Sequence, residues 1–333
     1  MTAPRLLVAL RSRDEVGKVL DGRLPGIPWR FTSESSPSDR ASIEALLLGS
    51  VARDLRDFNV RALPRLSFVQ RVYAGVDDIP FERFPREVRF AGNVGAYAPF
   101  VAEHAVALAL AAARELPRAH ELARLGELRP PPAQRLLYGR TATILGYGEI
   151  GRAIGDRLQG FGMRLFGLNR TGRMAPGVVG MFPAHRLKEA VAEGDYVFDA
   201  RPLTRWTEGT IDSAVLAAMK PDAVFLNIGR AGTVQEEALF RHLLDHPEFR
   251  AGLDVWWHER FADGRIDHRF PFGDLPNVVG TPHSAGFGPG VEEYVLDRAV
   301  ENLGRFFTGE QPRHVVDRTE YERPKGELGR GVD

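Results

Sequence analysis

The sequence predicts an α/β protein built on parallel sheets, and three observations support this fold class. Short apolar runs alternate with helical patterns along most of the chain, which is the order expected when helices cover both faces of a parallel sheet. A glycine-rich turn follows one of these runs, at Gly146. The chain has 333 residues, of which 44% are hydrophobic, and this length predicts two domains rather than one.

The first part of the chain supplies strands and helical patterns in alternation. Glycine, asparagine and proline then cluster at Gly92–Pro99, so this block is expected to end there. Its predicted elements are the strands Arg5–Leu10, Ala45–Leu48 and Ser67–Val72, and the stretches with helical patterns Arg11–Leu20 and Ile43–Asp57.

The middle and the end of the chain predict a second sheet between two long helices. Val101–Arg114 is rich in alanine and apolar almost all round, so it must be buried against its own domain or another subunit. The run Pro130–Pro132 marks a loop, and Val291–Phe307 is a long amphipathic helix. Six strands, the number in a complete dinucleotide-binding sheet, are predicted at Thr141–Leu145, Arg164–Leu168, Tyr196–Asp199, Ala223–Asn227, Gly252–Val255 and Asn277–Gly280.

The composition excludes several classes of function. Lysine plus arginine and aspartate plus glutamate are 44 each, so the net charge gives no reason to expect a nucleic-acid or membrane partner. No cysteine is present, which excludes disulfides, zinc–thiolate sites and cysteine nucleophiles. The run Leu6–Leu10 is too short for a signal peptide, and Ala105–Ala113 is too short to span a bilayer. We therefore expect a cytoplasmic protein.

The glycine-rich turn is the first motif that carries chemistry. In Gly146-Tyr-Gly148-Glu-Ile-Gly151, the first glycine permits a tight turn, the second lets the backbone approach a diphosphate, and the third lets the helix pack closely on the sheet. The alternative is a glycine-rich turn without a ligand, but a strand before it and a helix after it favour a dinucleotide. The predicted cofactor contacts in this turn are Gly146, Tyr147, Gly148, Glu149, Ile150 and Gly151.

The end of the next strand bears on which dinucleotide binds. NAD-dependent enzymes place an acidic residue there to bind the adenosine ribose, whereas this chain has Asn169, followed by Arg170 and Thr171. Asn169 does not repel a 2′-phosphate, and an arginine and a hydroxyl can donate hydrogen bonds to one. NADP is therefore the preferred cofactor and NAD a possible one. The alternative is that Arg170 is an ordinary solvated arginine.

Histidines spaced four apart raise the question of a metal site. His242 and His246 have this spacing on a predicted helix, which can bind zinc. No third ligand is evident and Pro247 ends the helix, so no metal is expected.

At this point the residues resemble a known family, the D-isomer-specific 2-hydroxyacid dehydrogenases. The resemblance extends from about Val72 to Gly286 and rests on seven pieces that occur in the family's order. One such piece would mean little, but seven in order are not expected by chance. They are Val72–Asp77 (VYAGVD), Val101–His104 (VAEH), the glycine turn, Pro202–Thr204 (PLT) with Thr207, Leu226–Arg230 (LNIGR), Leu253–Val255 (LDV) leading to Glu259, and Thr281–Gly286 (TPHSAG).

The resemblance implies that Arg230, Glu259 and His283 carry out the chemistry. Reduction of a ketone builds negative charge on its oxygen, so a histidine suits the task of proton donor. A carboxylate on the other ring nitrogen fixes the tautomer, and an arginine binds the substrate carboxylate and polarises the carbonyl. The family usually has proline after this glutamate, whereas this chain has Arg260 and then a long insertion-like stretch, and the adjacent His258 could compete for the role.

The resemblance also implies the remaining site residues. The substrate loop would be Tyr73, Ala74, Gly75 and Val76, acting together with Arg230, with the backbone N–H groups of the loop holding the substrate carboxylate. Further cofactor contacts would be Pro202, Thr207, Ile228, Gly229, Asp254 and Gly286.

Two Rossmann-like or flavodoxin-like parallel-sheet domains are implied as well, the cofactor domain being inserted into the substrate domain. The substrate domain is expected at residues 1–100 plus 289–333, and the dinucleotide-binding domain at 101–288. Family members commonly form homodimers, so a homodimer through the 101–114 helix region is expected.

The expected function is hydride transfer between NADP(H) or NAD(H) and a small 2-oxo or 2-hydroxy acid of the D series, with reduction of glyoxylate- or hydroxypyruvate-like acids. One alternative is a non-catalytic, dinucleotide-sensing protein such as the corepressors that resemble this family. Another is oxidation of formate or phosphite on the same scaffold. Formate enzymes pair the histidine with glutamine, so Glu259 disfavours formate.

Overall fold

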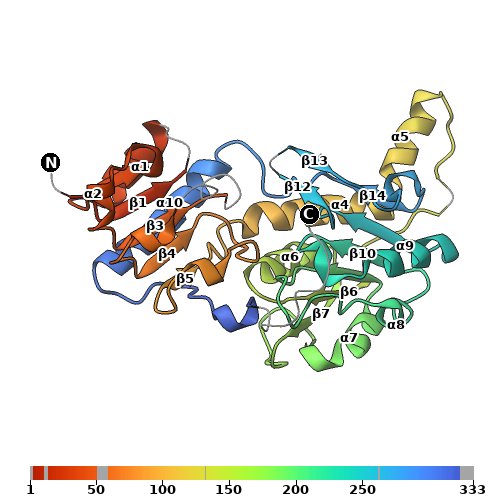
Figure 1. Cartoon of the computed structure of the whole chain (residues 1–333). Coiled ribbons are helices and arrows are strands. Elements are labelled where there is room, and N and C mark those ends of the chain that lie inside the picture. Colours follow the sequence, from red (N-terminus) through yellow and green to blue (C-terminus); the bar gives the residue numbers. More distant parts are fainter. Residues whose placement is uncertain (1–2, 11–13, 51–58, 132, 262, 323–333) are drawn as a thin grey trace. The chain divides into compact units, whose positions relative to one another are not determined.

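The computed structural model describes residues 3–10, 14–50, 59–131, 133–261 and 263–322. The chain divides into two compact units (Figure 1). Unit 1 consists of residues 1–97 and 288–333, and unit 2 consists of residues 98–287. The second unit is therefore inserted between the two segments of the first.

Unit 1 contains a parallel sheet with the strand order β2-β1-β3-β4-β5. Every residue of the three inner strands is buried. This explains why Leu6–Ala9 and Ala45–Leu48 are continuous apolar runs rather than alternating patterns, whereas the third inner strand ends in the polar residues Gln70 and Arg71. The strands are β1 (Leu6–Ala9), β2 (Trp29–Phe31), β3 (Ala45–Leu48), β4 (Phe68–Arg71) and β5 (Arg89–Ala91).

The long helices of unit 1 come from opposite ends of the chain. α1 (Asp14–Arg23) packs against α10 (Val291–Phe307), and Arg23 donates to Asp297 over 2.6 Å. The predicted helical pattern in residues 43–57 is wrong for 45–48, which form β3, and residues 51–58 lie outside the described part. The shorter helices are α2 (Pro37–Arg40), η1 (Thr32–Glu34), η2 (Val60–Ala62), η3 (Phe81–Arg83) and η7 (Arg318–Glu320).

Unit 2 contains a second parallel sheet with the order β14-β11-β10-β9-β6-β7-β8. The chain starts this sheet at β6 and builds outward on both sides, so the strand order reverses beside β6, where dinucleotides bind in sheets of this kind. The strands are β6 (Thr141–Leu145), β7 (Arg164–Asn169), β8 (Gly180–Pro183), β9 (Tyr196–Asp199), β10 (Val224–Asn227), β11 (Arg250–Leu253) and β14 (Val278–Gly280). A separate hairpin pairs β12 (Glu259–Arg260) with β13 (Arg265–Ile266).

The helices of unit 2 account for the apolar segment after residue 100. α4 (Ala98–Ala113) packs against β10, β11, β14 and α6 of its own unit, whereas α5 (Leu116–Arg124) has no buried residue and extends away from the sheet (Figure 1). The other helices are α6 (Glu149–Gln159), α7 (Leu187–Glu193), α8 (Ser213–Leu216), α9 (Glu236–Asp245), η4 (Ala184–Arg186), η5 (Ala231–Thr233) and η6 (Phe272–Asp274). Among the described helices, none is long and apolar enough to cross a membrane.

Candidate active site

The glycine turn connects β6 to α6. Gly146 has a φ of +86°, and the amides of Gly146 and Tyr147 each donate to the carbonyl of Leu168 over 2.9 Å. The turn is thereby fixed to the end of β7. A Cβ on Gly146 would lie 3.0 Å from the backbone of Ala200, so this position requires glycine for both its conformation and its space.

The other two glycines of the motif have opposite surroundings. A Cβ on Gly151 would lie 2.4 Å from the carbonyl oxygen of Gly146, whereas a Cβ on Gly148 would meet nothing within 4 Å. No side chain caps α6, so its first N–H groups are available to an anion. Gly148 therefore borders open space at an uncapped helix N-terminus, an arrangement that fits a diphosphate.

Of the side chains predicted in this turn, Tyr147 points inward. It is 4% exposed, its ring lies against Gly155 and Gly167, and its hydroxyl donates to Pro176 over 3.4 Å. Burial raises the pKa of the Tyr147 hydroxyl. Its ring therefore supports the turn, and only its backbone is open to a cofactor. Glu149 forms an ion pair with Arg152.

The loop after β7 is organised by Asn169. The side-chain oxygen of Asn169 accepts hydrogen bonds from the amides of Thr171 (3.1 Å) and Gly172 (2.7 Å), and its amide nitrogen donates to the carbonyl of Arg173 (2.8 Å). Arg170 and Thr171 are exposed beside it. Asn169 thus shapes the loop with a neutral side chain, a role that the sequence prediction did not include.

Glu259 and His283 are brought together at the carboxyl side of the sheet in unit 2. Both carboxylate oxygens of Glu259 lie 2.9 Å from Nδ1 of His283, and one of them also accepts from the amide of Trp256 over 2.8 Å. The neighbouring His258 has a different partner, since its Nε2 lies 3.3 Å from Glu236. The contact with the His283 ring is therefore made by Glu259, despite the Arg260 that follows it.

A buried carboxylate holds the loop that carries His283. Asp254 is 1% exposed and accepts hydrogen bonds from the Thr281 hydroxyl (2.6 Å) and from the amides of Ser284 (2.8 Å) and Ala285 (3.1 Å). Burial raises the pKa of Asp254, but hydrogen bonds from His104, Thr281 and the two amides outweigh it, so the net shift is downward. The side chain of Asp254, predicted to contact the cofactor, therefore fixes the histidine loop.

His104 joins this network from α4. Its Nε2 lies 2.9 Å from the hydroxyl of Thr281 and 3.4 Å from a carboxylate oxygen of Asp254. From the sequence, His104 was expected only as part of a family-like segment. No local pattern reveals its contact with Thr281, which is 177 residues away.

Arg230 lies shortly after the end of β10, behind Ile228 and Gly229, at a point where the backbone is heavily hydrogen-bonded. Its carbonyl accepts from Asn227 (3.2 Å) and Thr233 (2.8 Å), and its Nη1 donates to the carbonyl of Gly229 (2.9 Å). A Cβ on Gly229 would lie 2.6 Å from the carbonyl oxygen of Arg201. The strand end is therefore tightly packed, and Arg230 is half-buried.

A buried ion pair that the sequence did not predict supports the adjoining loops. Asp199 is fully buried and accepts two hydrogen bonds from the guanidinium of Arg201, at 2.8 and 2.7 Å, and one from the Thr233 hydroxyl at 2.8 Å. In the following loop, the Thr207 hydroxyl donates to the carbonyl of Pro202 over 2.6 Å. The ion pair thus ties the Pro202–Thr207 loop to the segment after Arg230. The other predicted cofactor residues, Ile228 and Gly286, are buried and half-buried respectively.

The predicted substrate loop lies in unit 1, after β4. The side-chain amide of Asn93 donates to the carbonyl of Val72 over 2.8 Å and to that of Val295 over 2.7 Å, and its backbone amide donates to Tyr73 over 3.0 Å. Asn93 is 6% exposed. It therefore anchors the start of the loop to α10, a role that the sequence did not predict, since Gly92–Pro99 was expected only to mark a boundary.

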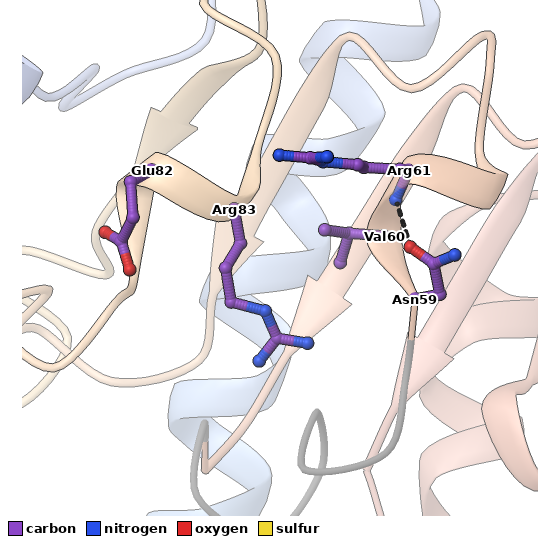
Figure 2. Close-up of a pocket in the computed structure, with 5 residues that line it drawn as sticks. All are labelled: Asn59, Val60, Arg61, Glu82 and Arg83. Carbon is purple, nitrogen blue, oxygen red and sulfur yellow. Dashed lines mark hydrogen bonds between the residues drawn. The ribbon is translucent and has the colours of Figure 1, made fainter.

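Two other features do not include any of these residues. His242 and His246 stack with ring centroids 4.2 Å apart, and burial and His246 lower the pKa of His242 to about 4. Within the described ranges, no three histidine, aspartate or glutamate side chains cluster as a metal site. Figure 2 shows a pocket of about 470 Å³ in unit 1, lined by Asn59, Val60, Arg61, Glu82 and Arg83. None of these five lining residues is a predicted site residue.

Comparisons with known proteins agree with the motifs. The NAD-binding domain of D-isomer-specific 2-hydroxyacid dehydrogenases matches residues 106–285. A glyoxylate reductase of Pyrococcus furiosus is 33% identical over 77% of this chain and 77% of its own length. One of Korarchaeum cryptofilum is 32% identical over 90% of this chain and 91% of its own.

A solved structure agrees over nearly the whole chain. The NADPH-dependent glyoxylate/hydroxypyruvate reductase of Sinorhizobium meliloti, in complex with NADP and sulfate, has a TM-score of 0.79 and 25% identity. The similarity covers 96% of this chain and all of that one.

Proposed function

The chain belongs to the D-isomer-specific 2-hydroxyacid dehydrogenases, a family of NAD(P)-dependent oxidoreductases, and we propose that it reduces small 2-oxo acids of the glyoxylate and hydroxypyruvate kind. The observation that carries the proposal is the Glu259–His283 pair, with both carboxylate oxygens 2.9 Å from the ring nitrogen. A histidine oriented in this way can donate a proton to a carbonyl oxygen. The relatives named glyoxylate reductase support the substrate class.

In the proposed reaction Glu259, His283 and Arg230 have different tasks. The bound dinucleotide supplies the hydride. Glu259 accepts a hydrogen bond from the Nδ1–H of His283, which fixes the tautomer and leaves Nε2 to donate a proton to the carbonyl oxygen. Arg230 binds the substrate carboxylate and stabilises the charge that develops on the carbonyl oxygen. The ketone thereby gains one hydride and one proton and becomes the hydroxyl of the D-2-hydroxy acid.

We further propose that NADP is preferred over NAD. The strand end after β7 carries a neutral Asn169, whose oxygen is used by the amides of Thr171 and Gly172, so no carboxylate repels a 2′-phosphate. Arg170 and Thr171 are exposed next to it and can both donate to a phosphate. One charge-assisted hydrogen bond gives roughly a 10- to 100-fold preference, less where solvent screens it.

The test is an initial-rate assay of glyoxylate, hydroxypyruvate and other 2-oxo acids with NADPH and with NADH. We expect turnover, a lower KM for NADPH, and loss of that preference in Arg170→Ala. His283→Ala should lower kcat by roughly 10²- to 10⁴-fold with little change in cofactor affinity. His258→Ala is the matched control because His258 is paired with Glu236.

Two outcomes would count against the proposal. Absence of turnover with every 2-oxo acid, despite dinucleotide binding, would favour the dinucleotide-sensing alternative. Equal or better use of NADH would mean that Arg170 does not bind the 2′-phosphate.

A further inference from the structure

Arg71, the last residue of β4, is a buried cation with unused hydrogen-bond donors. It is 4% exposed, and its Nη2 donates to Asp78 over 2.7 Å. Its Nε and Nη1 atoms are also buried, and in the described part of the chain neither has a hydrogen-bond partner. Because a buried donor without a partner is costly, this arrangement calls for an acceptor.

The position of Arg71 points to a ligand rather than to a structural role. It stands at the carboxyl end of a central strand, which is where open α/β sheets bind ligands. The predicted substrate loop begins two positions later, at Tyr73, and the ring of Tyr73 lies over the guanidinium at 5.3 Å. Asn93 fixes the start of this loop. Arg71 is therefore in contact with the first residue of the segment proposed to bind the substrate.

The charges around Arg71 favour an anion. Asp78 engages only one of the nitrogens of the guanidinium, and its side chain is 51% exposed, so solvent weakens its compensation of the buried charge. A guanidinium presents five N–H donors in a planar fork that matches the oxygens of a carboxylate or phosphate. The rings beside it, Tyr73 and Tyr97, lie 6.4 Å apart and carry no charge to compete for an anion.

We propose that Arg71 binds a second anionic group of the substrate, so that the preferred 2-oxo acid carries a carboxylate or phosphate on its tail. This inference rests on the proposed function and extends it, since glyoxylate has no tail and would leave Nε and Nη1 of Arg71 unused. Within unit 1, the backbone of the Tyr73–Val76 loop would bind the carboxylate next to the carbonyl, and Arg71 the distal anion.

The test compares kcat/KM for four probes in the full-length protein with saturating cofactor. Oxaloacetate carries a carboxylate tail and 3-phosphohydroxypyruvate a phosphate tail, whereas glyoxylate and hydroxypyruvate have no second charge. We expect the wild type to favour one of the charged-tail acids over its uncharged counterpart by about 10- to 100-fold, the factor that one charge-assisted hydrogen bond provides. The preferred charged probe distinguishes a carboxylate from a phosphate.

Three variants isolate the contribution of Arg71. Arg71→Met should lower the ratio of charged-tail to uncharged kcat/KM by about 10- to 100-fold, mainly through KM, and Arg71→Lys should restore part of it. Asp78→Asn should raise the ratio because it removes a competing carboxylate. Arg61→Met is the control, because Arg61 is an exposed arginine of the same unit and should leave the ratio unchanged.

The outcomes separate this inference from the function on which it rests. If no 2-oxo acid is reduced, the proposed function fails. If glyoxylate is reduced but the wild type shows no preference for a charged tail, or if Arg71→Met and Arg71→Lys keep the wild-type ratio, the role of Arg71 is overturned. Melting temperatures of the variants confirm that the folded protein was assayed.

Discussion

His283 combines a strained backbone with a well-defined side-chain partner. Its φ is +53°, a left-handed conformation that costs a non-glycine residue about 1–3 kcal/mol. Its amide donates to the carbonyl of Asp254 over 2.7 Å, and Asp254 also accepts from Thr281, Ser284 and Ala285. The network around this carboxylate compensates for the strain and aims the ring at Glu259.

Replacement of Glu259 by glutamine tests the importance of the carboxylate charge. Glutamine can still accept from the amide of Trp256, but it carries no charge and offers one acceptor oxygen where the carboxylate offers two. We expect Glu259→Gln to lower kcat for ketone reduction by roughly tenfold or more, because the carboxylate no longer orients the His283 ring. The measurement is kcat at saturating substrate and cofactor, with His258→Ala as control. A wild-type kcat in Glu259→Gln would contradict the proposed role.

Single residues could be predicted where a short motif carries them. The pairing of Glu259 with His283 was expected from the resemblance, and the two side chains are in contact. The contributions of His104 and Asn93 could not be predicted, because each acts through contacts with residues that are distant in the sequence. Tyr147 lies within a recognised motif, yet its side chain packs inside the unit and is buried.

At the scale of elements, the strands that sequence analysis missed in the two large sheets are all edge strands. β2, β5 and β8 each lie at the edge of a sheet and lack a continuous buried run, so no strong apolar pattern marks them. β11 was predicted from Gly252 but begins at Arg250. The guanidinium of Arg250 can be buried because its hydrogen bonds to the carbonyls of Ala112 and Ala113, both 2.9 Å long, compensate for the loss of water. A hydrophobicity pattern cannot reveal a strand that begins with such a residue.

The strand–turn–helix element gives a matched pair of glycine variants. Gly151→Ala would place a Cβ 2.4 Å from the Gly146 carbonyl oxygen, whereas Gly148→Ala would place one in open space. We expect Gly151→Ala to lower the melting temperature by several degrees, since overpacking costs about 1–3 kcal/mol. Gly148→Ala should fold normally but bind NADPH at least about tenfold more weakly, because its methyl group occupies the space proposed for the diphosphate.

Thermal unfolding and a titration of NADPH binding measure both effects. If Gly148→Ala binds NADPH as tightly as the wild type, the diphosphate does not approach this glycine. A Gly151→Ala protein as stable as the wild type would show that α6 can move away from the turn.

At the scale of the whole molecule, the expected fold class is confirmed, with one parallel-sheet unit inserted into another. The alternation of strands and helices predicted the parallel sheets. The insertion of one unit into the other was predicted only from the family resemblance, because no local pattern shows that α10 packs against α1. The apolar segment 101–114 was expected at a homodimer interface. Its apolar residues are largely buried within unit 2, so they do not by themselves require a partner.

We propose a different surface as the contact of the expected homodimer. α5 has no buried residue, and Leu116, Leu125 and Leu128 on this helix and the segment after it are 49%, 59% and 105% exposed. Exposed apolar side chains that gather on one element mark an interaction surface, and a second copy of the chain is the partner that the family resemblance implies. We therefore place the proposed interface on α5 and residues 125–128.

Introducing charge there should separate the subunits. We expect the wild type to sediment at twice the 36.9 kDa of one chain and the double variant Leu125→Asp/Leu128→Asp at the mass of one chain, because burying an unpaired carboxylate at an interface costs several kcal/mol. Both leucines are exposed, so the variant should keep the wild-type melting temperature when measured under conditions where both proteins are monomeric. Leu244→Asp, at a 54% exposed leucine of α9, is the matched control and should remain dimeric. A monomeric wild type, or a double variant that stays dimeric, would remove α5 as the contact between subunits.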